Sequence, residues 1–210
     1  MFEYQDLSAE QTRALRTTYE PLTKSVRELI DATIRSEVDA EAVAAAKAHI
    51  DQATMSLRAR QLPGSFGVRV AAAGDAGSDM AWGNAVVGLR NPIAPPVQVD
   101  RMPDGAVAAR FHLGAAYEGP PGHVHGGVSA MILDHLLGEA ASDGDQPRLT
   151  GTITMRYRRL TALGDLRAHA RIDRIDGHKT YAVGHIADGQ GVTVEAEGVF
   201  ITPKWLRDQQ

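Results

Sequence analysis

The 210-residue chain (22.5 kDa) is long enough for one large domain, or for one domain with an appendage. Acidic residues outnumber basic ones by 26 to 22, so the net charge is −4 and a nucleic-acid binder, which usually carries a basic surplus, is not expected. The lack of cysteine excludes a disulfide framework, thiol catalysis and cysteine-ligated zinc. No secretory signal or run of about 18 apolar residues is visible, so we expect a cytoplasmic protein without a membrane span.

The first sixty residues are predicted to be helical. Ser8 and Gln11 form a capping-box pattern that opens a helix running to about Tyr19. Pro21 suits the first turn of a second helix, and Asp39 suits the cap of a third. The third helix has one apolar face, made by Val43, Ala46, Ile50, Ala53 and Leu57. Because these helices hold no cluster of titratable side chains, we interpret them as a helical cap or an oligomerisation element.

From about residue 97 the chain alternates apolar and polar residues with period two, which indicates an antiparallel sheet with one face in water. The alternation is strict over residues 107–113, 153–157, 166–172 and 192–198, and the glycine-containing turns DGHK and DGQG separate the later strands. The segment 126–141 has almost no polar stripe, so it is predicted to be a buried helix. The order strand, helix, then four strands predicts an α+β fold whose antiparallel sheet wraps around one central helix.

This sheet domain is predicted to occupy residues 81–210. Residues 1–80 are predicted to form the helical extension and a Gly/Ala-rich connector with one short strand, in which glycine, alanine and aspartate show little periodicity. NPIAPP, at 91–96, cannot be a regular helix and is interpreted as an extended entry into the sheet.

Asp134 lies within the predicted buried helix, where a carboxylate is costly unless it is hydrogen-bonded, metal-bound or needed for chemistry. A carboxyl bonded to the backbone, or one facing a polar cleft, is the alternative interpretation. Just upstream, GPPGHVHGG (119–127) forms an irregular loop whose glycines expose backbone N–H groups where the helix begins. Such donors, at the positive end of the helix dipole, suit an anion or a developing oxyanion.

The spacing of Gly126 and Asp134 predicts a homodimer. Eight residues of helix separate them, which is about 12 Å at 1.5 Å per residue. Both groups must come within about 3 Å of one reacting carbonyl and its attacking water, and one helix cannot readily supply both. Two helices packed antiparallel about a two-fold axis bring Gly126 of one chain to Asp134 of the other, in a dimer or a dimer of dimers.

The string GPPGHVHGGVSAMILDHLLG resembles the signature of the hotdog-fold acyl-CoA thioesterases, especially the PaaI-like and THEM-type branch. In that pattern a His-Gly-Gly opens the central helix and an Asp follows nine residues after the His, as His125, Gly126, Gly127 and Asp134 do here. The resemblance covers about half of the chain, roughly residues 97–202, and leaves the N-terminal helices outside. It implies a hotdog fold and hydrolysis of an acyl-CoA to the free acid and coenzyme A, without a metal or redox cofactor.

The resemblance also implies roles for single residues. The Gly126 amide would polarise the thioester carbonyl, and Gly127 would let the helix begin close to the substrate. His125, also counted among the catalytic residues, would shape the loop and could bond a substrate or backbone carbonyl. Asp134 would act as general base toward water, or would attack the carbonyl directly. Thr150, sixteen residues later, matches a threonine beside the carboxylate that could orient the water; a plain strand threonine is the alternative.

Several further residues are candidates for substrate contacts. His123 lies in the same loop as His125. Arg158, His178 and Lys179, together with Arg159, could contact the phosphates of coenzyme A, although solvated positions at a sheet edge are the commoner explanation for such residues.

Three other functions stay open on the sequence. A metal-dependent hydrolase would use His123, His125, Asp134 and His135, but these lack a fourth ligand at a familiar spacing, and we expect no metal. A non-catalytic acyl-CoA-binding hotdog protein, acting as a sensor or assembly module, would share the fold, and the presence of Asp134 favours the enzyme. A hydratase would need an Asp–His pair acting on one atom, whereas the adjacent Asp134 and His135 point about 100° apart on a helix.

Overall fold

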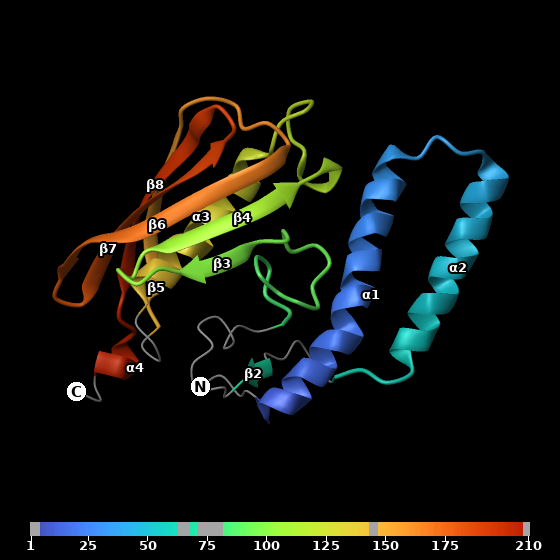
Figure 1. Ribbon diagram of the computed structural model, residues 1–210, viewed down its shortest axis with the longest axis horizontal. Coiled ribbons are helices and arrows are strands. Elements are labelled where there is room, and N and C mark those ends of the chain that lie inside the picture. Colours follow the sequence, from blue (N-terminus) through green and yellow to red (C-terminus); the bar gives the residue numbers. More distant parts are fainter. Residues whose placement is uncertain (1–4, 63–67, 71–81, 143–146, 208–210) are drawn as a thin grey trace.

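The computed structural model describes residues 5–62, 68–70, 82–142 and 147–207 (Figure 1). Its N-terminal elements are β1 (Gln5–Leu7), α1 (Ala9–Arg35), α2 (Ala40–Arg58) and β2 (Val68–Val70). The remaining elements are β3 (Gln98–Arg101), β4 (Val107–Leu113), the 3-10 helix η1 (Ala115–Tyr117), α3 (Gly126–Ala141), β5 (Leu149–Tyr157), β6 (Gly164–Asp176), β7 (Lys179–Asp188), β8 (Gly191–Ile201) and α4 (Lys204–Arg207). The predicted strand, helix and four strands are therefore confirmed as β4, α3 and β5 to β8. The domain boundary at residues 80 and 81 stays a prediction, since 71–81 lie outside the described residues.

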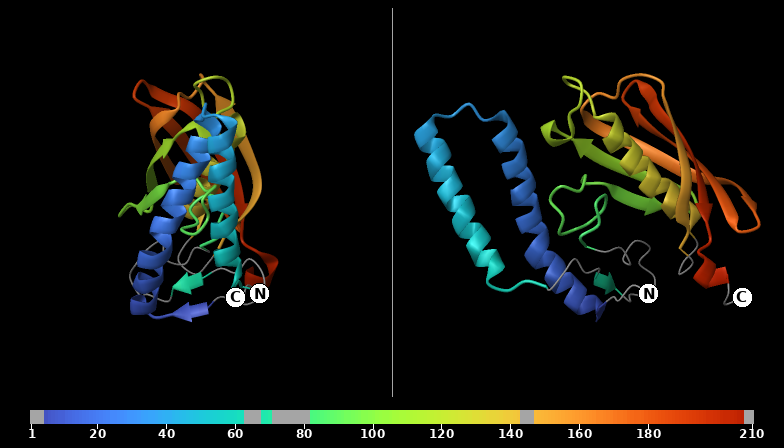
Figure 2. Two further views of the ribbon diagram at one scale, coloured as in Figure 1. Left: turned by 90° about the vertical axis from the view of Figure 1, so that its right-hand side faces the viewer. Right: turned by 180° about the vertical axis from the view of Figure 1, so that it is seen from behind.

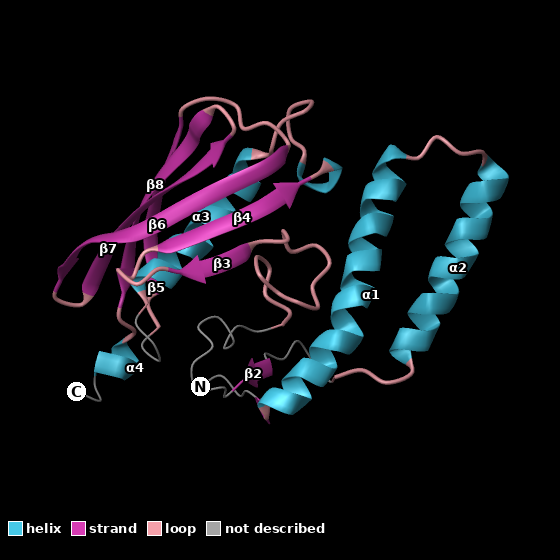
Figure 3. Ribbon diagram, viewed as in Figure 1, coloured by secondary structure: helices cyan, strands magenta, loops and turns pink. Residues whose placement is uncertain are grey.

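Strands β3 to β8 form one antiparallel sheet in the order β3-β4-β6-β7-β8-β5, and α3 lies across one of its faces (Figures 2 and 3). On β4, Val107, Phe111 and Leu113 are buried on the helix side, whereas Arg110 and His112 are exposed. The predicted division into one covered and one wet face is confirmed. Strands β3 and β5 form the two edges of the sheet, and β5 is the longer of them, at nine residues.

Helix α3 lies close to the sheet because the strands beneath it carry small residues. Ala170, Gly184 and Ala196 are direct neighbours on β6, β7 and β8. A Cβ atom on Gly184 would lie 2.7 Å from the backbone oxygen of His169 and 3.2 Å from Cδ2 of Leu137 on α3, so there is no room for a larger residue at this position. The core that this contact creates includes Leu133, Leu136, Leu137 and Phe200, all fully buried.

Helix α1 runs through Pro21 without interruption, so the prediction of two separate helices on either side of this residue was wrong. Its predicted start is confirmed: Ser8 Oγ accepts from the N–H of Gln11 at 3.2 Å, and the Gln11 side chain accepts from the N–H of Ser8 at 2.8 Å. A proline inside a helix removes one backbone hydrogen bond and costs about 3 kcal/mol. Contacts of Leu15, Tyr19 and Arg27, on both sides of the proline, offset this cost.

These contacts join α1 to the loop that precedes β3. Leu15 packs in a small apolar cluster around the buried Trp82, and the guanidinium of Arg90 lies 3.6 Å from the ring centroid of Tyr19. Helix α2, by contrast, buries none of its residues, and it lies on the far side of α1 from the sheet (Figures 1 and 2). Its predicted cap is confirmed, since Asp39 accepts from the N–H of Ala42 at 2.9 Å. No helix in the described part of the chain is long and apolar enough to cross a membrane.

The predicted hairpin turns are confirmed between β6 and β7 and between β7 and β8, with Gly177 and Gly191 at positive φ. The second turn is held by Arg159, which donates from Nη1 to Oδ2 of Asp188 at 2.8 Å and from Nη2 to Oδ1 of the same carboxylate. This guanidinium lowers the pKa of Asp188 to about 2, and a hydrogen bond from the N–H of Gln190 adds to the effect. Arg159 is a candidate coenzyme A contact on the sequence. In the structure its guanidinium already pairs with Asp188 within the fold.

Replacing Phe200 by alanine is expected to lower the free energy of unfolding by about 3–5 kcal/mol, because it leaves a cavity between α3 and the sheet. The ring is fully buried and lies 3.4 Å from where a Cβ atom on Gly138 would be. Chemical denaturation measures the change. Ile175→Ala is the matched control, since Ile175 is 60% exposed near the end of β6; an equal loss in both variants would contradict the assigned core.

Replacing Asp188 by asparagine is expected to destabilise the protein at neutral pH but not in strong acid. The pKa of Asp188 is about 2 in the folded state and 3.8 as its ordinary value, so its stabilisation is complete above the higher value and is lost as the pH falls through about 2. Urea unfolding of both proteins across this range measures the difference. A difference that does not shrink on acidification would contradict the ion pair.

Candidate active site

Helix α3 begins with one unused backbone donor. His125 is the N-cap: its Nδ1 accepts from the N–H of Gly127 at 3.0 Å, and its carbonyl accepts from the N–H groups of Val128 and Ser129 at 2.9 and 3.3 Å. The N–H of Gly126 has no hydrogen-bond partner among the described residues. Of the several donors expected from the sequence, the fold leaves this one available at the positive end of the helix dipole.

The loop before the helix is tightly folded, as its prolines and glycines predicted. Gly122 has φ +73°, and a Cβ atom on Gly119 would lie 2.7 Å from Cα of His125. The Nδ1–H of His123 donates to the carbonyl of Pro121 at 2.8 Å. The ring of His123 therefore helps to hold the loop, and its role in substrate binding stays a prediction.

Tyr157, at the end of β5, contacts the first residue of α3 and was not singled out by the sequence. Its hydroxyl donates to the carbonyl of Gly126 at 2.9 Å, and a Cβ atom on Gly126 would lie 3.4 Å from its ring. In the sequence it is one more apolar position in an alternating strand. Only the pairing of β5 with β8, which carries β5 to the edge beside α3, shows that this tyrosine meets the helix start.

Asp134 lies half-buried on α3, and its Oδ1 accepts from the hydroxyl of Thr150 at 2.9 Å. The pairing of β5 with β8 shifts by one residue between Thr150 and Thr152, and such a bulge re-aims the neighbouring side chain. Oδ2 of Asp134 has no hydrogen-bond partner in the described part of the chain. The structure thus places Thr150 against Asp134, and leaves the carboxylate open on one side.

His135 faces away from Asp134. Its Nε2 lies 3.9 Å from Oε1 of Glu139, which in turn meets Arg101 on β3, the edge opposite to β5. Burial lowers the pKa of His135, although the carboxylates of Glu139 and Asp134 oppose the shift. The two neighbours thus point to opposite edges of the sheet, as the helical geometry predicted, and do not act on one atom.

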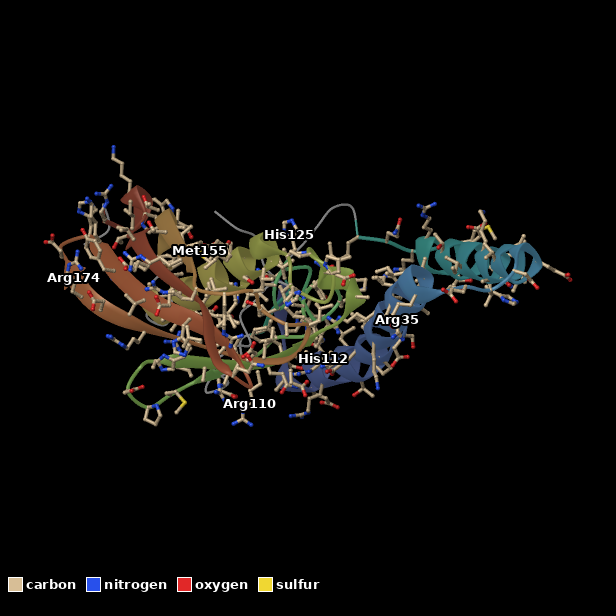
Figure 4. The ribbon with its side chains drawn as sticks, turned by 90° about the horizontal axis from the view of Figure 1, so that it is seen from above. Arg35, Arg110, His112, His125, Met155 and Arg174 are labelled. Atoms are coloured by element: carbon tan, nitrogen blue, oxygen red, sulfur yellow. The ribbon has the colours of Figure 1, made fainter. Side chains whose placement is uncertain are left out.

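Two contacts between α3 and β5 therefore define the candidate site: Gly126 with Tyr157, and Asp134 with Thr150. Both lie at the same edge of the sheet, on the helix side, where Figure 4 places the labelled His125; Arg110 and His112 lie on the opposite, outer side. Within one chain the two contacts stay about 12 Å apart along the helix. In a single copy of the chain, both contacts lie at the β5 edge, but they are too far apart to act on the same carbonyl group.

The predicted coenzyme A contacts are not brought together. Arg158 pairs with Glu195, its Nη2 lying 2.6 Å from Oε2, near the end of β5 that meets the helix start. His178 and Lys179 lie at the β6–β7 turn, where Lys179 is in register with Ile201 on β8. The backbone N–H of Arg158 bonds the carbonyl of Thr193, so about 26 Å of β8 separates these positions at 3.3 Å per residue. Their roles stay predictions.

The histidines and acids of the metal-site alternative are also separated. His125 caps α3, His123 is bonded within the loop, and Asp134 and His135 face different edges. Over the described ranges, no three His, Asp or Glu side chains are grouped so that they could hold a metal ion.

Comparison with known proteins agrees with this architecture. The family model described as thioesterase superfamily matches residues 121–195, which contain most of the loop, all of α3 and both contacts of the candidate site. The human acyl-coenzyme A thioesterase THEM5 is 30% identical over 94 residues, which are 43% of this chain. The match spans 38% of the length of that human protein.

Among solved structures, protein RHA08564, a thioesterase superfamily protein, superposes with a TM-score of 0.76 and 31% identity. The match covers 87% of this chain and 90% of that one, more than residues 82–210 alone can supply, so it extends into the N-terminal helices. Zebra fish thioesterase superfamily member 2 shares the fold at 14% identity, with a TM-score of 0.50 over 58% of this chain and 91% of its own. The predicted hotdog fold is thereby confirmed, and the chain belongs to the thioesterase superfamily.

Proposed function

We propose that this protein hydrolyses an acyl-CoA thioester to the free acid and coenzyme A, in a site shared between two copies of the chain. One observation carries the proposal: Asp134, bonded to Thr150, and the unused N–H of Gly126 lie at the same sheet edge, about 12 Å apart. A carboxylate and an exposed amide are the two groups that thioester hydrolysis needs. The human relative, named an acyl-coenzyme A thioesterase, supports the choice of substrate.

The free edge of β5 supports the proposal that a second copy of the chain completes the site. This strand pairs with β8 on one side only, contains no proline and carries a single charged residue, Arg156. Such an edge is a template for another strand. Antiparallel pairing of β5 with its two-fold copy reverses the direction of the partner, so the Gly126 end of one chain lies beside the Asp134 end of the other. The pairing thus brings Gly126 of one chain close to Asp134 of the other, and it does so at two equivalent sites.

In the proposed reaction, Asp134 takes a proton from water while the water oxygen attacks the thioester carbonyl carbon. Thr150 holds Oδ1, which leaves Oδ2 to accept that proton. The oxyanion that forms accepts the hydrogen bond of the Gly126 N–H. When the carbon–sulfur bond breaks, the thiolate of coenzyme A leaves and takes the proton that Asp134 had accepted, which restores the carboxylate. Direct attack by Asp134 to give a mixed anhydride, then hydrolysed by water, uses the same two groups.

The remaining groups complete the proposal. Gly127 and His125 keep the helix start close to the substrate, and His123 holds the loop beside it. Arg158 of one chain, with His178 and Lys179 of the other, are proposed to contact the phosphates of coenzyme A, because antiparallel pairing brings these opposite ends of the sheet toward each other. The reaction calls for no cofactor, and we place the protein in the cytoplasm.

Asp134→Asn is expected to lower kcat on every member of an acyl-CoA panel by about 10²–10⁴-fold, the contribution typical of a general base. A thiol-release assay over short, long and aromatic acyl groups measures it. The amide keeps the size of the carboxyl and the hydrogen bond from Thr150, so dimerisation and substrate binding should persist.

Asp165→Asn is the matched control, because that carboxylate is almost fully exposed on the outer face of the sheet, bonded to His112. Turnover by the Asp134 variant at the rate of this control would show the catalytic assignment to be wrong. Binding of acyl-CoA by the wild type without any hydrolysis would instead favour the non-catalytic binding protein.

Gly126→Pro tests the proposed oxyanion donor, since proline lacks the N–H and suits the first position of a helix. Gly126 has no positive φ, and its neighbours keep their bonds to His125. The variant is expected to lose about 10²–10³-fold in kcat, the usual effect of deleting one such donor.

Gly126→Ala keeps the N–H and adds a comparable Cβ atom, at an ordinary 3.4 Å from the ring of Tyr157. It should therefore retain most of the activity. Equal activity of the two variants would show that this amide does not bind the oxyanion.

A further inference from the structure

Helix α2 buries none of its residues, although its sequence carries a regular apolar seam. The seam consists of Val43, Ala46, Ile50, Ala53 and Leu57, spaced alternately by three and four residues, which is the heptad pattern of helices that pack in pairs. Val43, Ile50 and Leu57 are 54%, 39% and 49% exposed. A 19-residue helix with such a face and no buried residue has no packing partner for that face among the described residues of its own chain.

Helix α1 also exposes apolar side chains, Leu22, Leu29 and Ile34, but unlike α2 it is joined to the rest of the described structure by side-chain contacts. Helix α1 packs through Leu15 on the Trp82 cluster, and Arg27 Nη2 donates to the carbonyl of Asn91 at 3.2 Å. Polar contacts within α2 itself, such as Lys47 with Asp51, lie along one helix and bury nothing. The seam therefore stays uncovered while the neighbouring helix is anchored.

We infer that the α2 seam packs antiparallel against the same seam of a second copy of this chain. This interaction surface is separate from the β5 edge and goes beyond the proposed function. Side-chain volume favours the pairing: when the helices are aligned so that Val43 meets Ala53 of the other copy, Ala46 meets Ile50. These four layers, counting the two-fold equivalents, each combine one large and one small side chain, which fills the centre of the interface evenly, and Leu57 lies beyond them, beside the N-cap of the partner helix.

Charge favours the same partner and the same direction. The N-terminal end of α2 is acidic, with Glu37, Asp39 and Glu41, whereas its C-terminal end is basic, with Arg58 and Arg60. Antiparallel pairing with an identical helix places each acidic end beside a basic end. It also orients the two helix dipoles in opposite directions, which is the favourable arrangement for neighbouring helices. A parallel pair would place like charges together at both ends.

Distances between single labels test the pairing directly. The chain has no cysteine, so His49→Cys and Ser56→Cys, both at the edge of the seam and exposed, each provide one attachment point for a spin label in the full-length protein. Antiparallel pairing predicts that the two copies of residue 49 are offset along the axis by about 3 Å, and those of residue 56 by about 24 Å, at 1.5 Å per residue. Pulsed electron spin resonance on each variant measures the two separations.

A short separation at residue 49 together with a long one at residue 56 would support the inference. Equal separations at both positions would mean parallel packing, and the absence of any separation within range would mean that α2 meets a different partner or none; either result overturns it. Hydrolysis of acyl-CoA is measured on the same samples, and its outcome is independent of the distances.

Substitutions in the seam provide the second arm of the experiment. Ile50→Glu, which places a charge in the centre of the seam, is expected to abolish the short separation at residue 49. Met55→Glu is the matched control, because Met55 is 67% exposed on the same helix but lies outside the seam. Loss of the short separation in both variants, or in neither, would overturn the assignment of the surface.

Discussion

The close approach of α3 to the sheet is the constraint on which the rest of the domain depends. A row of small residues, Ala170, Gly184 and Ala196, lets the leucines of the helix reach the strands. With its sheet-facing side so deeply buried, the helix cannot rotate, and the side chains on its flanks are fixed in direction. Asp134 is thereby held toward the β5 edge, and His135 toward the β3 edge. Packing between apolar groups thus orients the polar ones.

The same packing explains why so few polar contacts suffice at the candidate site. Burying α3 over its length sets where it begins, and the loop of prolines and glycines then needs only His125 to satisfy three of the first four N–H groups. The Gly126 amide is left over because the cap has no further acceptor. An available donor at this point is a result of how the helix is capped, and it costs the fold no buried, unsatisfied group once a ligand or water occupies it.

Much of the fold could be predicted from the sequence, because apolar and polar residues alternate regularly in the strands and the segment that forms α3 is apolar on nearly every side. Asp134 and the helix start were recognisable for a similar reason, since a carboxylate in an apolar helix and a glycine-rich loop are local signals. Tyr157 was not predictable, because its contact with Gly126 depends on which strand forms the edge. The prediction that the helix is interrupted at Pro21 was wrong because contacts of α1 with Arg90 and Trp82, which are distant in sequence, outweigh the tendency of proline to end a helix. Arg159 is occupied for the same kind of reason, since Asp188 lies 29 residues away.

The unpaired edge of β5 also bears on how an isolated copy of the chain behaves. A newly folded copy exposes nine residues of strand with one charge and no proline, which is the kind of segment that adds to any available sheet. In the dimer that we propose, the two-fold copy of β5 covers this segment, whereas an isolated copy of the chain leaves its backbone groups open to pairing with any other exposed strand.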